Sequence, residues 1–229
     1  YLIRSEKMGY KIAIDGPAGA GKSTIAKAVA KELNFVYIDT GAMYRAMALY
    51  FAENGIDLSD EKGVAAACQA IRIDIAYEDG RQQILLQGEN VTARIRTERV
   101  GTLASQAAKN PDVRKKLSQL QREQEEKTDV VMDGRDIGTE VLPDAELKIF
   151  LTASVETRAS RRYKELTERG ESCNIEEIEK NIRMRDEQDM YREIAPLTQA
   201  EDAVYLDSSD LRIEEVTERI LSLYRERAF

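Results

Sequence analysis

Residues 11–23 read KIAIDGPAGAGKS, and their pattern indicates the fold class. Its apolar segment, Lys11–Asp15, predicts a strand, and a helical pattern follows from about Lys22 to Leu33. Gly16–Ser23 matches GxxxxGK[ST], the pattern of a loop that wraps around phosphate groups between a strand and a helix. Successive backbone N–H groups of such a loop, together with the helix N-terminus, favour an anion. We therefore expect ATP or a close relative to bind here.

Individual residues of this loop have separate expected roles. Lys22 directs a positive charge toward the β- and γ-phosphates, and the Ser23 hydroxyl is a candidate ligand for Mg²⁺. The predicted ATP-binding residues of the loop are Gly16, Pro17, Ala18, Gly19, Ala20, Gly21, Lys22, Ser23 and Thr24. The alternative is a glycine-rich turn that matches the pattern by chance, but the flanking strand and helix favour the phosphate loop.

A second acidic residue is expected to complete this site. Val130–Asp133 is an apolar run that predicts a buried strand and places Asp133 at its carboxyl end. Ligands of α/β sheets bind at that edge, so Asp133 is a candidate to hold or orient Mg²⁺, directly or through water. A helix-capping or turn aspartate before Gly134 is the alternative.

Composition narrows the class of protein. The 229 residues, 42% hydrophobic and 33% charged, are enough for one globular domain with a small appendage. The formal net charge of −8 argues against a general nucleic-acid scaffold, and no apolar run is long enough to span a bilayer. The absence of histidine excludes Ser–His and Cys–His catalysis and the common zinc sites. Cys68 and Cys173 favour free thiols in the cytosol, with a disulfide between them as the alternative.

Strand and helix patterns alternate along most of the chain. The expected strands of the main sheet are 11–15, 35–38, 130–133, 147–151 and 203–206. The expected helices are 22–33, 41–54, 61–70, 98–109, 111–127, one capped by Ser154, one from Asn174 to about Met190, and an amphipathic one through Ile213 and Leu223. This order predicts an α/β fold of the P-loop NTPase type, in which a parallel five-stranded sheet carries helices on both faces.

The period of the pattern changes after residue 70. Ile71, Ile73 and Ile75 alternate with other residues, Glu78–Gly80 predicts a turn, and Gln83–Leu86 predicts a second strand that ends in another turn. Two strands joined in this way form an antiparallel hairpin. We therefore expect a small β subdomain inserted into the α/β pattern.

Arginine is the residue type that suggests the acceptor of the phosphoryl group. The candidates are Arg45, Arg114, Arg135, Arg158, Arg161, Arg162, Arg185 and Arg192. Planar guanidinium groups bind phosphate through paired hydrogen bonds and offset the repulsion between two polyanions. An acceptor that is already an anion, such as a nucleoside monophosphate, needs no general base, which agrees with the absence of histidine.

Four segments together resemble one family. Residues 14–23 (IDGPAGAGKS), 39–45 (DTGAMYR), 133–139 (DGRDIGT) and 194–197 (IAPL) resemble those of bacterial cytidylate kinases, in the same order. These enzymes are nucleoside monophosphate kinases. The resemblance extends from about residue 8 to the end, and the hairpin insert is similar to the extra β subdomain of that family. It is far more specific than the phosphate loop alone.

The resemblance implies ligands for the acceptor phosphate and the base. Thr40, Arg45 and Arg135 match residues at the acceptor phosphate. Ser105, Arg114 and Asp136 match the cytosine readers. A carboxylate such as Asp136 accepts a hydrogen bond from the exocyclic amine of cytosine, whereas the carbonyl of uracil would face it with lone pairs.

The charged segment 185–192 (RDEQDMYR) matches further acceptor residues. Asp189 resembles the ribose ligand, and Arg185 and Arg192 lie beside sugar and phosphate in the family. Arg185 and Asp189 are four positions apart, so a helix places them on one face. The alternative for this segment is a solvated, salt-bridged helix face.

The three arginines of the segment after Ser154 match the family's short lid over ATP. One of them is expected to act on the transferring phosphoryl group in the manner of an arginine finger, with Arg162 as the candidate, and Arg158 and Arg161 are expected to bind ATP. A plain surface role for at least one of the three is the alternative. The expected catalytic residues are therefore Lys22, Arg135, Arg185 and Arg162. Tyr44 and Met43 are expected to pack rather than to bind.

The implied reaction is transfer of the γ-phosphoryl group of MgATP to CMP or dCMP, in pyrimidine nucleotide metabolism. The expected organisation is a leader at 1–7, disordered or foreign to the fold, followed by a kinase core at about 8–60, 98–153 and 192–229, a β insert at about 61–97 and a lid at about 154–191. We expect a cytoplasmic monomer that binds neither nucleic acid nor membrane. The alternatives are a kinase for another small acceptor, such as UMP or dTMP, and an RNA-associated or regulatory module that hydrolyses ATP slowly.

Overall fold

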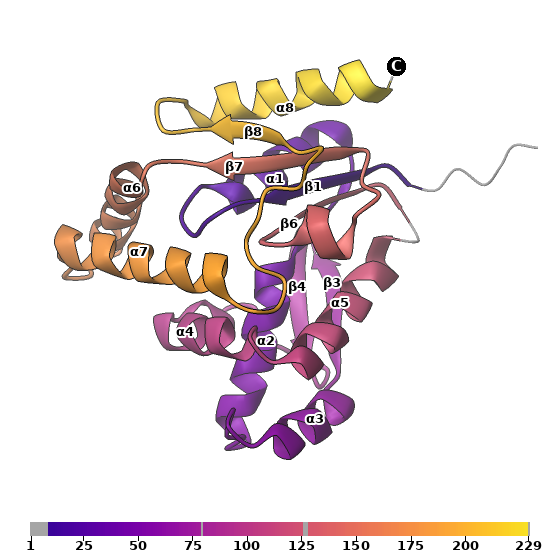
Figure 1. Cartoon of the computed structure of the whole chain (residues 1–229), viewed down its shortest axis with the longest axis vertical. Coiled ribbons are helices and arrows are strands. Elements are labelled where there is room, and N and C mark those ends of the chain that lie inside the picture. The colour runs from indigo at the N-terminus through magenta and orange to yellow at the C-terminus, as the bar shows by residue number, and fades with distance from the viewer. Residues whose placement is uncertain (1–8, 79, 126–127, 229) are drawn as a thin grey trace, which may run out of the picture. The chain divides into compact units, whose positions relative to one another are not determined.

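The computed structural model describes residues 9–78, 80–125 and 128–228 (Figure 1). The predicted leader at residues 1–7 lies outside them. The chain forms two compact units. The described residues of the first are 9–37 and 128–228, and those of the second are 38–78 and 80–125.

A five-stranded sheet organises the first unit. Its order is β2–β6–β1–β7–β8, and β1 runs parallel to both β6 and β7. The strands are β1 (Lys11–Asp15), β2 (Val36–Asp39), β6 (Val130–Gly134), β7 (Leu147–Thr152) and β8 (Val204–Asp207). Strands β1 and β6 are buried along their whole length, as expected for parallel strands that are covered on both faces. The predicted parallel α/β sheet is confirmed.

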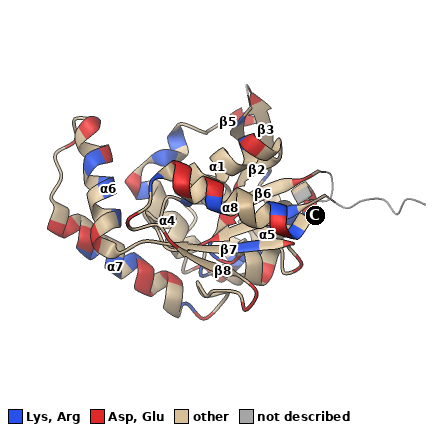
Figure 2. Cartoon of the chain, turned by 90° about the horizontal axis from the view of Figure 1, so that it is seen from above, with Lys and Arg blue, Asp and Glu red and all other residues tan. Residues whose placement is uncertain are grey.

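Helices of the first unit cover the sheet and extend beyond it. Apolar side chains of α1 (Lys22–Leu33) and α8 (Ile213–Ala228) share one core with β1, β6 and β7. Two further helices, α6 (Val155–Glu168) and α7 (Ile175–Tyr191), lie side by side and share a small core around Ala159 and Ile178 (Figure 1). Both acidic and basic residues occur along α6, α7 and α8 (Figure 2).

The second unit combines four helices with the hairpin insert. The helices are α2 (Thr40–Glu53), α3 (Glu61–Ala70), α4 (Glu98–Ala107) and α5 (Pro111–Glu125), with a short 3₁₀ turn η1 (Arg94–Arg96). Strands β3 (Ile73–Glu78) and β4 (Arg81–Leu86) pair antiparallel, and a two-residue strand β5 (Glu89–Asn90) extends the sheet. Phe51, Met47, Ile84 and Leu117 are fully buried in their common core.

Most predicted elements begin and end within one or two residues of the observed ones. Ser154 caps α6, because its Oγ accepts a hydrogen bond from Thr157 N at 3.1 Å, and Asn174 caps α7. Two features differ. Strand β5 extends the predicted hairpin, and a single π-helical turn, η2 (Ile137–Val141), follows β6. In the second unit, α2, α4 and α5 share a core with the hairpin.

Candidate active site

The phosphate loop requires glycine for steric reasons. At Gly16, φ is +150°, and a Cβ would lie 1.9 Å from the carbonyl oxygen of Leu151. Gly21, the residue before α1, has φ +88°, which side-chain-bearing residues rarely adopt. No other residue type fits at Gly16, and the loop leads directly into the first turn of α1. This is the geometry expected of an anion-binding loop.

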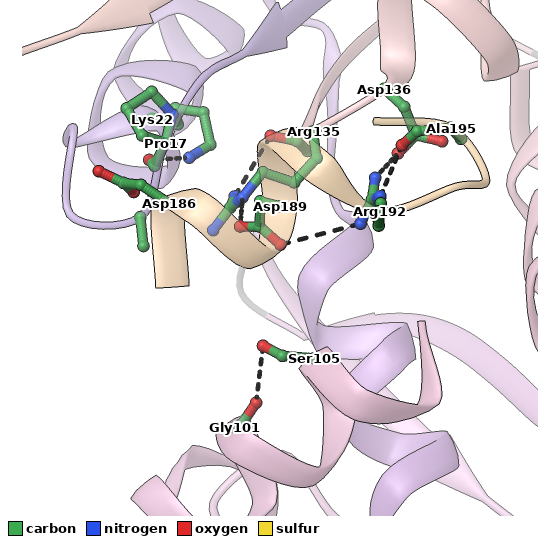
Figure 3. A network of polar contacts seen from close by, with 12 residues as sticks. Pro17, Lys22, Gly101, Ser105, Arg135, Asp136, Asp186, Asp189, Arg192 and Ala195 are labelled. Carbon is green, nitrogen blue, oxygen red and sulfur yellow. Dashed lines mark hydrogen bonds and ion pairs between the residues drawn. The ribbon is translucent and has the colours of Figure 1, made fainter. Parts of the chain in front are cut away.

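Lys22 is fixed within this loop. Its side chain is buried, and its Nζ donates a hydrogen bond to the Pro17 carbonyl oxygen at 2.7 Å (Figure 3). Burial lowers the pKa of Lys22 to about 7; the Arg135 charge acts in the same direction, and Asp133 opposes it. A bound polyphosphate would favour the charged form. The position of Lys22 and the lowered pKa of its amine therefore make its protonation sensitive to a bound anion.

Asp133 contacts two hydroxyl groups at the carboxyl end of β6. Its Oδ2 accepts from Ser23 Oγ at 2.9 Å, and its Oδ1 accepts from Tyr37 OH at 2.8 Å. The contact with Ser23 joins the two candidate Mg²⁺ ligands. Carboxylate and hydroxyl oxygens are the hard donors that Mg²⁺ prefers, so this pair fits the ion. No group of three or more acidic or cysteine side chains with metal-binding geometry occurs in the described part of the chain.

A network of buried arginine and aspartate side chains follows β6 (Figure 3). Arg135 Nε donates to Asp189 Oδ2 at 2.8 Å. Arg192 lies with one amino group 3.8 Å from Asp189 Oδ1 and the other 3.6 Å from Asp136 Oδ1. Burial would raise the pKa of Asp189, but the arginines, Arg135 above all, outweigh it and lower the pKa. The network brings together four predicted acceptor ligands: Arg135, Asp136, Asp189 and Arg192.

Arg185 belongs to the same electrostatic environment. It lies one turn before Asp189 on α7 and contributes to the lowered pKa of that carboxyl. Burial would lower the pKa of Arg135, but Asp189 raises it above the ordinary value. Segment 185–192 is thus half buried, and its charged side chains are paired around Asp189. These contacts are more specific than those of a solvated, salt-bridged helix face, which was the alternative for this segment.

The IAPL segment holds the end of α7. Ala195 has φ +47°, which is rare for alanine, and its carbonyl oxygen accepts from Arg192 Nε at 2.6 Å. Leu197 N donates to the Asp189 carbonyl oxygen at 2.8 Å. Strained backbone held by specific contacts is common at functional sites. The segment therefore fixes the two residues that complete the network.

The three lid arginines have different surroundings. Arg158 is buried and donates to the carbonyl oxygens of Ala18 at 3.0 Å and Ala153 at 2.9 Å. Arg161 donates to the Ser208 carbonyl oxygen at 2.6 Å. Arg162 is more exposed and pairs with Glu165 on the same helix at 2.8 Å. Of the three, Arg158 supports the phosphate loop through its backbone.

Arg158 also pairs with a buried carboxylate of α7. Its second amino group lies 2.7 Å from Asp186 Oδ2, while Asp186 Oδ1 has no hydrogen-bond partner among the described residues. Arg158→Met would leave this buried charge uncompensated. We expect the free energy of unfolding to fall by about 3–5 kcal/mol, measured by urea denaturation.

A matched control exists in the same helix pair. Arg183 of α7 pairs with Glu156 of α6 at 2.8 Å, but both side chains are more than half exposed. Arg183→Met should change the stability by at most about 1 kcal/mol. Equal effects of the two variants would show that the Arg158 contact is no stronger than a surface ion pair.

In the second unit, the start of α2 carries two other predicted ligands. Asp39 caps the helix by accepting from Ala42 N at 2.8 Å, and Arg45 approaches the same carboxylate at 3.2 Å. Arg45 Nε is buried and has no hydrogen-bond partner within residues 9–78, 80–125 and 128–228. Thr40 is buried beside them. An unsatisfied buried donor is costly, which favours a ligand that accepts from Arg45.

Several contacts in this unit were not predicted. Gln82 of the hairpin accepts from Asp39 N at 2.7 Å, and Arg96 lies 3.7 Å from the Asp39 carboxylate. Arg114 is buried, donates to the Ala108 carbonyl oxygen and stands 5.7 Å from the centre of the Tyr44 ring. Tyr44 therefore supports a predicted base reader. Ser105 Oγ donates to Gly101 O at 3.2 Å, one turn earlier on α4.

Comparison with known proteins agrees with this geometry. The family model for cytidylate kinase matches residues 12–226. The cytidylate kinase of Carboxydothermus hydrogenoformans is 50% identical over 213 residues, covering 93% of this chain and 96% of its own. That of Bacillus licheniformis is 48% identical over 218 residues, covering 95% and 96%.

Solved structures agree on the fold alone. A gluconokinase from Sinorhizobium meliloti matches with a TM-score of 0.50 and 14% identity, covering 97% of this chain and 96% of its own. An uncharacterised protein from Eubacterium ventriosum matches with a TM-score of 0.52 and 15% identity, covering 96% and 100%. Among the described residues, no helix combines the length and apolar character needed to cross a membrane. The sequence match over nearly the whole chain is decisive: the chain belongs to the cytidylate kinase family.

Proposed function

We propose that this chain transfers the γ-phosphoryl group of ATP to CMP, giving ADP and CDP, and that it also accepts dCMP. One observation carries the proposal beyond family membership. Adjacent parallel strands end in the phosphate loop and in the Asp133–Asp136 segment, with Asp15 of β1 opposite Gly134 of β6. The phosphate loop and a buried arginine network therefore lie at the same edge of one sheet, which is the edge where α/β sheets bind ligands.

The reaction needs positioning and charge rather than a general base. A phosphate oxygen of CMP, mostly a dianion at neutral pH, attacks the γ-phosphorus, and the bond from phosphorus to the β–γ bridging oxygen breaks. The electron pair of that bond leaves with ADP. At 4 Å, two unit charges interact by roughly 4 kcal/mol at an effective dielectric of 20, so repulsion between the substrates is substantial. Lys22 and the arginines offset it.

Mg²⁺ is the proposed cofactor, together with ATP. Ser23 and Asp133 would hold it, directly or through water, because their oxygens already lie 2.9 Å apart. When bound, the ion neutralises charge on the phosphate oxygens. Tyr37, which donates to the other oxygen of Asp133, fixes the orientation of that carboxylate.

The proposed ligands for CMP are the residues that the family resemblance implies, and each set is described within its own unit. In the first unit, Arg135 and Arg185 bind the acceptor phosphate, Asp136 accepts from the cytosine amine, and Asp189 and Arg192 serve the ribose and phosphate. In the second unit, Thr40 and Arg45 bind the phosphate, and Ser105 and Arg114 bind the base. Figure 3 and the contacts above support the first set through the buried network, and the buried Arg45 supports the second.

The ATP side has a corresponding assignment. Residues 16–24 bind the phosphates, and Arg162 acts on the transferring phosphoryl group. Arg158 and Arg161 contribute to ATP binding. For Arg158 the contact with the Ala18 carbonyl oxygen indicates that it acts by shaping the loop. We further propose a cytoplasmic monomer that acts on free nucleotides and binds neither nucleic acid nor membrane.

ADP production with a panel of acceptors tests this function. The acceptors are CMP, dCMP, UMP, AMP, dTMP and none, each with MgATP. Rapid turnover with CMP and dCMP and little without an acceptor is expected. Equal turnover with UMP would retain the kinase and remove the role of Asp136, while acceptor-independent ADP release would indicate an ATPase.

ATP binding is expected to take up a proton at Lys22. The pKa of Lys22 is lowered to about 7 by burial, so at pH 8 the amine is largely neutral before ATP binds. ATP phosphates favour the charged form, so binding should take up nearly one proton and weaken by up to tenfold per pH unit above 7. The number of protons taken up per ATP bound is measured by calorimetry at pH 8 in buffers of different ionisation enthalpy. Lys22→Met should abolish it; uptake that persists in this variant would contradict the assignment.

A further inference from the structure

Asp15 adjoins the phosphate loop in the sequence, but its side chain contacts the segment that follows β6. It is the last residue of β1 and directly precedes Gly16. Its Oδ1 accepts from Ile137 N at 2.8 Å, and its Oδ2 accepts from Gly138 N at 2.7 Å. The side chain is 5% exposed. Both carboxylate oxygens are therefore committed to the backbone that follows β6.

These two amides open the π-helical turn η2. The N–H groups at the start of a helix have no partner within it, so they need acceptors from elsewhere. Asp136 is the residue before the turn, with φ −145° and ψ 28°, outside the helical region. Its own side chain forms no cap. Asp15 supplies the missing acceptors from the neighbouring strand, and this fixes the backbone at Asp136.

The turn is also held from the other side. A Cβ on Gly138 would lie 3.1 Å from Lys148 Cδ and 3.4 Å from Asp15 Oδ2, so the turn packs closely on the Lys148 stem. Lys148 Nζ is itself fixed by the Pro143 carbonyl oxygen at 2.6 Å and by Asp202 at 2.9 Å. The position of residues 136–138 is therefore determined by β1 on one side and β7 on the other.

We propose that Asp15 is a positioning residue for the acceptor, which sets the place of Asp136 and Arg135, and that it contributes little to ATP binding. This rests on the function proposed above. Burial raises the pKa of Asp15 to about 6; Asp136 acts in the same direction, while the Ile137 and Gly138 amides and Lys22 oppose it. At pH 8 the Asp15 carboxyl group is ionised and accepts hydrogen bonds from both amides, so the tests are made at that pH.

Asp15→Asn is the first test. The amide keeps the size of the side chain but replaces one acceptor with an N–H donor that faces another N–H. Loss of a hydrogen bond to a charged group predicts a rise in KM for CMP of about tenfold or more. The Kd for ATP, measured by calorimetry, should change less than twofold, and the preference for CMP over UMP should fall. A merely structural defect would move both substrates together.

A second variant loosens the same turn without substituting a residue of β1. Gly138→Ala places a methyl group against Lys148 and should give the same pattern: a raised KM for CMP, an unchanged Kd for ATP. It also serves if Asp15→Asn fails to fold. The control is Asp144→Asn, which removes a mostly exposed carboxylate that contacts Lys11 at the other end of β1 and should leave both constants unchanged.

The outcomes separate the two proposals. If the unaltered chain phosphorylates CMP but Asp15→Asn weakens ATP binding as much as CMP use, or changes neither, the role of Asp15 is wrong. If the unaltered chain forms ADP without regard to the acceptor, the proposed function is wrong. In that case calorimetric binding of CMP to the unaltered chain and to Gly138→Ala still decides whether the turn positions an acceptor site.

Discussion

Lys22→Met is expected to lower kcat for CDP formation by about 100–1000-fold, the usual cost of removing one preorganised electrostatic contact. Lys22 Nζ is held 2.7 Å from the Pro17 carbonyl oxygen, so the amine is in position before ATP arrives, and the phosphates of ATP favour its charged form. Methionine keeps most of the length and apolar character and removes the charge. Initial rates with saturating MgATP and CMP measure the effect, and thermal denaturation confirms that the variant is folded.

The control for this prediction lies on the same helix. Lys31 is exposed in the last turn of α1 and contacts none of the proposed site. Lys31→Met should leave kcat within twofold. A loss of less than about threefold for Lys22→Met would mean that the phosphate loop binds ATP without the charge that the mechanism requires.

Asp136→Asn is expected to reduce the preference for CMP over UMP by about 5–150-fold, equivalent to about 1–3 kcal/mol per base contact. Asp136 is buried with one oxygen 3.6 Å from Arg192. In the proposed site, this carboxylate accepts a hydrogen bond from the amine of cytosine. Asparagine offers an N–H to the carbonyl of uracil instead, so kcat/KM for CMP should fall while that for UMP falls less or rises.

The ratio of kcat/KM for the two nucleotides measures this change. Asp210→Asn, an exposed aspartate of the loop before α8, is the control and should leave the ratio unchanged. If Asp136→Asn lowers activity with CMP and UMP equally, Asp136 supports the site but does not read the base.

The fold could be predicted where local signals agree. The phosphate loop between β1 and α1, the buried strands and the Ser154 and Asn174 caps depend on residues close together in the sequence. Strand β5 was not predicted, because two residues are too few to show the alternation of apolar and polar side chains that is typical of a strand. The turn η2 was missed because its stability depends on Asp15, more than 120 positions away.

The site was predicted in part, for a similar reason. The motifs identified Asp133, Arg135, Asp136 and Asp189, and the structure brings the last three into one network with Arg192. Their partners could not be read from the sequence. Tyr37 and Gln82 acquire a role only through a long-range hydrogen bond, and a tyrosine or glutamine carries no motif of its own. The sequence predicted that Arg158 is a lid residue that binds ATP. Its contacts with the Ala18 carbonyl oxygen and with Asp186 join segments far apart in the sequence, so only the structure shows them.

The most direct test of the central claim follows the phosphoryl group itself. ATP labelled in the γ-phosphate is incubated with Mg²⁺, CMP and the protein, and the labelled products are separated. If the chain transfers the γ-phosphoryl group to CMP, the label appears in CDP, in an amount equal to the ADP formed, and little label is released when CMP is omitted. Label recovered as inorganic phosphate at the same rate with and without CMP would contradict it.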